Sequence, residues 1–212
     1  MLESVTPLAA SAVALAMPLI LAALGELVVE RAGVLNLGLE GMMLLGALAA
    51  FATVAHGGGL VPAILAAAAA GILASLAFGF ITLTLQANQV AAGLSLTILG
   101  AGVSAFVGRQ YVGFRAPASF EDLPIPLLSK VPLLGPSLFS LNALGYATLA
   151  LLAGTAWFLY RTRAGLALRS IGESPVVARS LGLHVSRVRY GAVAFGGAMA
   201  GIAGCYYAVA QF

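Results

Sequence analysis

The sequence predicts an all-α protein, a polytopic transmembrane helical bundle of about six spans with the N-terminus outside and a short cytoplasmic helix. Of its 212 residues, 61% are hydrophobic and only 8% are charged, which is too few polar side chains to cover a soluble globule of this size. The apolar residues gather in runs of about 20, the length of helix that crosses a bilayer. No run alternates between polar and apolar residues, so a transmembrane β-barrel is not expected.

Six apolar runs are long enough to be spans. The segment before the first run contains Glu3 and lacks Lys and Arg, unlike the basic start of a signal peptide, so this run is expected to be a retained span. The predicted spans are residues 8–24, 34–55, 60–83, 88–108, 141–160 and 190–212. Small residues recur within them, and Gly197 and Gly201 have GxxxG spacing. Close packing of helix backbones is therefore expected.

The loop at residues 161–190 sets the predicted orientation. It holds six of the ten basic residues against one acid, Glu173: Arg161, Arg163, Arg169, Arg179, Arg187 and Arg189. Membrane proteins retain such loops on the cytoplasmic side. Topology therefore explains these arginines better than a nucleic-acid partner does. Counting spans outward places the N-terminus and residues 109–140 outside.

A short helix is expected within this cytoplasmic loop. Ser174 suits the N-cap, Pro175 the first helical position, and Gly182 the position just after the helix. Residues 109–140 form the predicted external loop, which contains Glu121 and Asp122. Its proline density excludes a continuous helix, leaving an ordered cap that receives a partner or a loose connection. The prolines are Pro117, Pro124, Pro126, Pro132 and Pro136.

Polar residues between and within the first two spans are candidates for a substrate path. They are Glu26, Glu30, Arg31, Asn36 and Glu40. Ionisable groups at membrane depth usually face a cavity, a partner or a transport path. The spacing of Asn36 and Glu40 places them on one helix face, and glycines between the acids favour a broken or re-entrant segment. The alternative is that the first three lie in water at the inner interface.

Asn88 and Gln89 form a second candidate pair, at the predicted turn before the fourth span. An amide just inside the span could bind a polar ligand. Ordinary turn chemistry is the alternative. Together with Glu26, Asn36 and Glu40, they make up the candidate substrate path.

Other chemistry is not expected. His56 and His184 lie on opposite predicted faces, and Cys205 is the single cysteine, so neither a metal site nor His-based catalysis is predicted. Lys130 is the single lysine and Val131 follows it, so the chain lacks the GxxxxGK[ST] loop that binds ATP phosphates. We therefore expect no enzyme activity and no cofactor in this chain.

The whole sequence resembles the permease subunits of bacterial ABC importers that take up nucleosides. The resemblance rests on ERAGVLNLGLEGMM at 30–43 and GESPVVARSLGL at 172–183, with PLLSKVPLLGP at 126–136 between them. Ribose and branched-chain amino-acid permeases are more distantly similar. The family continues beyond GGAMAGIAG with further spans, so the resemblance implies a C-terminally shortened permease domain at 1–212.

The resemblance also implies the partners and the location. A second permease subunit, a cytoplasmic ABC ATPase that binds ATP and Mg²⁺, and an external substrate-binding lipoprotein would join this chain in the bacterial inner membrane. The short helix at 174–181 matches the family's coupling helix, which docks on the ATPase. The coupling residues would be Gly172, Glu173, Ser174, Pro175, Val177, Ala178, Leu181 and Gly182.

The sequence leaves two alternatives to nucleoside import. Within the ABC importers, the substrate could be ribose or another sugar, because Asn, Gln and Glu side chains suit any ligand rich in hydroxyl groups. From another class, an ATP-independent secondary transporter or channel would use Glu26, Glu30 and Glu40 to carry protons or cations.

Overall fold

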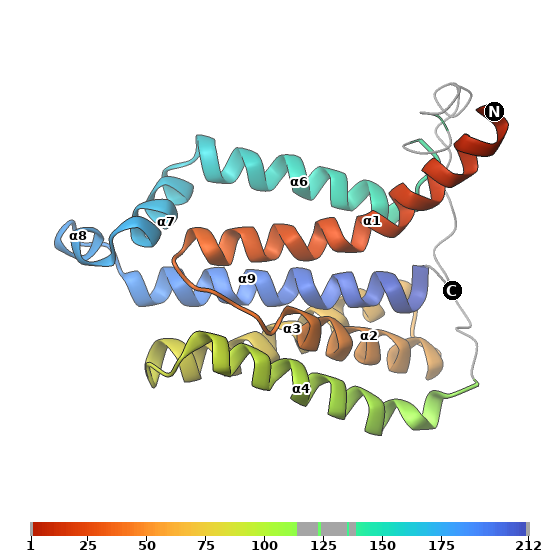
Figure 1. Ribbon diagram of the computed structural model, residues 1–212, viewed down its shortest axis with the longest axis horizontal. Coiled ribbons are helices and arrows are strands. Elements are labelled where there is room, and N and C mark those ends of the chain that lie inside the picture. Colours follow the sequence, from red (N-terminus) through yellow and green to blue (C-terminus); the bar gives the residue numbers. More distant parts are fainter. Residues whose placement is uncertain (1, 114–122, 124–134, 136–138, 211–212) are drawn as a thin grey trace.

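A computed structural model describes residues 2–113, 123, 135 and 139–210 of the chain, without the side chains of residues 2–5 and 210. Within these ranges, five helical segments are long and apolar enough to cross a bilayer, and a shorter apolar helix accompanies them. The predicted all-α bundle of about six membrane helices is therefore confirmed. Figure 1 shows the long helices lying side by side along one axis.

The helices have the following bounds in chain order: α1 (Leu2–Arg31), α2 (Leu39–Ala55), α3 (Leu60–Gly79), α4 (Gln89–Gly108), α6 (Ala143–Arg161), α7 (Arg163–Glu173), α8 (Pro175–Ser180) and α9 (Val185–Cys205). Two π-helical turns, Phe80–Thr84 and Tyr206–Ala210, extend α3 and α9, and a 3-10 turn, Arg109–Tyr111, follows α4.

The first two helices differ from the predicted spans. α1 continues to Arg31 instead of ending at residue 24, and α2 begins at Leu39 instead of residue 34. The apolar run predicted too early an end for α1, because Glu26 and Glu30 continue the helix although they are polar. Gly33, with a φ of +75°, then turns the chain out of the helix, in a conformation that glycine adopts readily.

α7 is a helix that the sequence analysis missed. The hydroxyl of Thr162 accepts a hydrogen bond from the Gly165 N–H at 3.0 Å and so caps its first turn. Gly165, Leu168 and Ile171 are buried at three-residue intervals, which gives this short helix one buried face among its arginines.

α9 lies at the centre of the bundle and contacts α1, α2 and α3. The predicted small-residue packing is confirmed here. A Cβ atom placed on Gly71 of α3 would lie only 3.0 Å from the Cα of Gly201. The two backbones therefore touch directly, as close helix association in lipid requires.

The two ends of the bundle carry different segments. Figure 1 shows α7 and α8 at the end opposite the chain termini, beside the C-terminal end of α1. This arrangement agrees with the predicted span order, while the assignment of that end to the cytoplasm stays a prediction. Most of the predicted external loop at 109–140, including Glu121 and Asp122, lies outside the described residues.

Candidate functional site

The segment that joins α1 to α2, residues 32–38, is not helical; we call it the crossover. It is partly buried in the bundle, with Leu35 and Leu37 exposed. Its side chain at Asn36 is only 2% exposed. Non-helical backbone inside a membrane bundle is stable only where its polar groups find partners. The sequence favoured a broken or re-entrant segment here. The hydrogen bonds of the crossover backbone show which side chains stabilise its non-helical conformation.

Four side chains from three helices bind the crossover backbone. Glu26 of α1 accepts the Asn36 N–H at 3.1 Å, and Gln89 of α4 accepts the Leu35 N–H at 2.8 Å. On the acceptor side, the Thr97 hydroxyl donates to the Leu37 carbonyl at 3.0 Å. Arg189 Nε of α9 donates to the Ala32 carbonyl, also at 3.0 Å. The crossover therefore has a defined shape that α1, α4 and α9 set together.

Asn36 stabilises its own turn. Its Oδ1 accepts the Gly38 N–H at 3.0 Å, while its Nδ2 reaches only the Met42 sulfur at 3.7 Å. A thioether is a weak acceptor, so the amide retains capacity to donate to a ligand. The expectation that Asn36 and Glu40 share a helix face is wrong, because Asn36 precedes the start of α2 at Leu39.

Glu26 is half-buried beside Asn36. One carboxyl oxygen accepts the Asn36 N–H, and the other, Oε2, is buried without a hydrogen-bond partner. An unpaired oxygen of this kind costs free energy unless something binds it. Among the sequence candidates, Glu26, Asn36 and Gln89 are brought together by the crossover.

The two remaining candidates have other surroundings. Asn88 is exposed and caps α4, because its Oδ1 accepts the N–H groups of Val90 and Ala91 at 2.9 and 3.1 Å. This geometry favours the turn interpretation of Asn88. Glu40 is exposed in the first turn of α2 and lines a cavity of about 340 Å³ with Met43 and Tyr207.

Thr97 and Arg189 were missed as crossover ligands. Arg189 was assigned to the basic loop for topology, yet it lies inside α9. Thr97 lies in the middle of the apolar helix α4, two residues after Ser95. Polar residues within spans tend to have a structural or functional partner, and this was the signal available in the sequence.

The predicted short helix is present as α8. Ser174 caps it by accepting the Val177 N–H at 3.4 Å, Pro175 is its first residue, and Gly182 has a φ of +82°. Ala178 is buried, whereas Val176, Val177 and Leu181 are 76%, 57% and 74% exposed. Of the other predicted coupling residues, Glu173 is exposed and Gly172 is partly buried. α8 thus presents apolar side chains outside the bundle.

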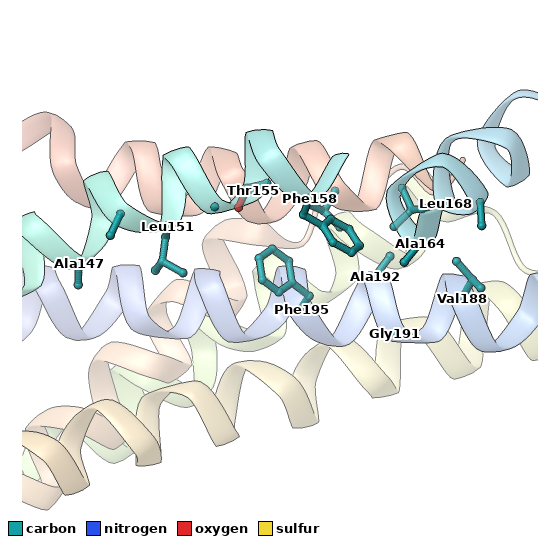
Figure 2. A pocket seen from close by; sticks show the side chains of 14 residues that line it. Ala147, Leu151, Thr155, Phe158, Ala164, Leu168, Val188, Gly191, Ala192 and Phe195 are labelled. Carbon is teal, nitrogen blue, oxygen red and sulfur yellow. The ribbon is translucent and has the colours of Figure 1, made fainter. Parts of the chain in front are cut away.

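An apolar groove of about 940 Å³ lies among α1, α6, α7 and α9. Figure 2 shows Leu151, Phe158 and Phe195 lining it, with Thr155 as a polar member. A ligand rich in hydroxyl groups would find few partners there, so the groove does not suit a nucleoside or sugar. The described residues also contain no group of three His, Cys, Asp or Glu side chains that could hold a metal ion.

Curated relatives include three transport proteins that align with about nine-tenths of this chain. The putative glucose ABC transporter permease protein TsgC13 of Haloferax volcanii is 38% identical over 196 residues. The guanosine ABC transporter permease protein NupQ of Bacillus subtilis is 36% identical over 208 residues. The nucleoside ABC transporter permease protein NupC of Lactococcus lactis is 31% identical over 205 residues.

Each alignment covers 91% of this chain, but only 59% of the Haloferax protein and 64% of each of the other two. No solved structure matches the chain. Residues 8–212 match the family described as branched-chain amino acid transport system / permease component. The chain therefore belongs to this permease family.

Proposed function

We propose that this chain is a permease subunit of an ATP-driven importer that moves nucleosides across the inner membrane by alternating access. The observation that carries the proposal is α8, a capped helix outside the bundle with Val176, Val177 and Leu181 exposed. Exposed apolar side chains on a short, rigid helix suit docking in a groove of a partner. The permease family of the chain supports an ABC ATPase as that partner.

The ATPase would hold ATP and Mg²⁺, and a second permease and an external substrate-binding lipoprotein would complete the importer. A bound nucleotide shifts a two-state permease only if it binds one state better. Docking on α8 supplies such a difference, because ATPase closure would favour one position of α8. The substrate would pass near the crossover, where Glu26 Oε2 and Asn36 Nδ2 have capacity to bind hydroxyl or amide groups.

The nucleoside substrate is supported by relatives named for guanosine and nucleoside transport. A sugar is the second candidate, since the Haloferax relative is named for glucose. Both ligands carry hydroxyl groups that carboxylate and amide side chains bind. A secondary transporter that uses the acids of α1 is a further alternative, and it requires no docking helix.

Uptake of labelled guanosine, uridine, glucose, ribose and leucine tests the proposal. Cells would carry the complete transport system with this chain, with or without its ATPase subunit. Uptake of nucleosides that disappears with the ATPase supports the proposal, and uptake of glucose or ribose alone selects the sugar alternative. Uptake that persists without the ATPase but collapses with the proton gradient would establish a secondary transporter instead.

A further inference from the structure

We infer that Gly172 and Arg189 are positioning residues that transmit the position of α8 to the crossover. This inference rests on the proposed transport function and adds the route by which α8 acts on residues 32–38. Gly172 lies on α7 and Arg189 on α9, the two helices that flank α8 in the chain. Both contact residues 31–33 at the end of α1, which we call the turn. Three structural steps support the route.

The first step is that α8 is packed onto its neighbours. Ala178 of α8 is buried together with Ile171 of α7 and Val185 of α9. The Leu183 N–H also donates to the Ala178 carbonyl at 3.1 Å. Because buried side chains in contact are close-packed and transmit strain, a force on α8 should move the end of α7 and the start of α9.

The second step is a direct backbone contact between α7 and the turn. A Cβ atom on Gly172 would lie 3.0 Å from the Arg31 carbonyl carbon and 3.2 Å from the Gly33 nitrogen. From the other side, a Cβ atom on Gly33 would lie 3.2 Å from the Cα of Gly172. No flexible side chain separates the two backbones, so α7 cannot shift without moving the turn.

The third step comes from α9. Arg189 Nε donates to the Ala32 carbonyl at 3.0 Å, and its Nη2 lies 3.0 Å from the Cβ position of Gly33. The turn is therefore held from both flanks of α8. Leu35 and Asn36 follow within the crossover, where their N–H groups are bound by Gln89 and Glu26. A shift of the turn therefore changes the positions of Leu35 and Asn36 relative to Gln89 of α4 and Glu26 of α1.

The test measures crossover movement in the complete importer, reconstituted in lipid nanodiscs. Cys205→Ser removes the native thiol, and Leu35→Cys places a probe on a side chain that is 40% exposed. The reaction rate of Cys at position 35 with a maleimide is measured without nucleotide and with ATP plus vanadate. In this parent protein the two rates should differ by about tenfold, within the usual range of coupling between sites.

Gly172→Ala and Arg189→Gln should each reduce that ratio to about twofold or less, while Arg189→Lys, which keeps a donor, should restore part of it. The matched controls are Gly191→Ala, whose Cβ meets nothing within 4 Å, and Arg187→Gln, at an exposed position. Both should keep the parental ratio. Size-exclusion profiles and basal ATP hydrolysis check that each variant assembles.

The outcomes separate the two levels of the proposal. A parent protein that takes up nucleosides only with ATP, but whose labelling rates are equal with and without nucleotide, overturns this route and leaves the function standing. A parent protein without ATP-dependent uptake of any of the solutes overturns the proposed function. A parent that responds, together with Gly172→Ala and Arg189→Gln variants that respond equally, overturns the route and leaves the function standing. Arg189→Gln acts from a different helix than Gly172→Ala, so it decides the matter if the glycine variant fails to assemble.

Discussion

The side-chain oxygen of Gln89 accepts a hydrogen bond from the Leu35 N–H at 2.8 Å, although 54 residues separate them in the sequence. This bond joins the first turn of α4 to the crossover. Thr97, two turns further along α4, donates its hydroxyl to the Leu37 carbonyl at 3.0 Å. One face of α4 therefore serves as the support on which the non-helical backbone lies.

Replacing Gln89 should loosen that support. Gln89→Ala leaves the Leu35 N–H without its acceptor, and we expect a loss of about 1 kcal/mol in the free energy of unfolding. Thermal unfolding in detergent, followed by circular dichroism, measures the effect. Gln110→Ala, at an exposed position, is the control and should change little. Equal losses in the two variants would refute a specific role for the Gln89 bond.

The packing of α9 on α3 gives a second prediction. A Cβ atom on Gly201 would lie 2.9 Å from the Ala67 carbonyl carbon, where there is no room for it. Gly201→Val should therefore destabilise the bundle by about 1–3 kcal/mol through overpacking. The same substitution at Gly191 on the same helix meets open space, so both variants share any change in helix propensity. A Gly191→Val variant as unstable as Gly201→Val would contradict the packing account.

Substitutions at Glu26 distinguish a carboxylate that holds the crossover backbone from one that carries a proton or cation. Glu26→Gln keeps an oxygen acceptor for the Asn36 N–H and places an amide NH2 where Oε2 was, which can still donate to a substrate hydroxyl. ATP-dependent uptake should therefore stay within about twofold of the parent. Glu26→Leu leaves that buried N–H unpaired and should cost about 1–3 kcal/mol of stability. Uptake and thermal unfolding are measured on both variants. Abolished uptake in Glu26→Gln, with normal stability, would favour the alternative in which Glu26 carries a proton.

The N-cap of α8 should control docking of the ATPase. Ser174→Ala removes the acceptor of the Val177 N–H and costs about 1 kcal/mol of helix stability. Affinity for the isolated ATPase, measured by biolayer interferometry on nanodiscs, should then fall by about fivefold. Ser174→Asp restores an equally good cap and should recover the affinity. An unchanged affinity in Ser174→Ala would show that docking does not depend on a preformed α8.

Local signals explain which elements were predictable from the sequence. The six membrane helices followed from the length of their apolar runs, because lipid requires helical backbone over about 20 residues. α8 followed from Ser174, Pro175 and Gly182, each of which acts on the backbone next to it. These features need no knowledge of distant contacts.

The crossover ligands were only partly predictable, because their partners are set by tertiary packing. Glu26, Asn36 and Gln89 were found as polar residues near apolar runs, but the sequence does not say that Gln89 meets Leu35. Arg189 carried a stronger signal, its positive charge beside a span, and that charge was attributed to topology. α7 was missed because its arginines hid the three-residue spacing of Gly165, Leu168 and Ile171.

The most direct test of the central claim, that α8 couples an ATPase to transport, is Val177→Glu combined with Leu181→Glu. Both side chains are exposed, so the bundle should fold normally. ATP hydrolysis and nucleoside uptake are measured together in proteoliposomes that contain the complete importer. Ser186→Glu, at an exposed position outside α8, controls for added charge. The account predicts that the double variant loses substrate-stimulated hydrolysis and uptake together while the control keeps both; normal uptake in the double variant would contradict it.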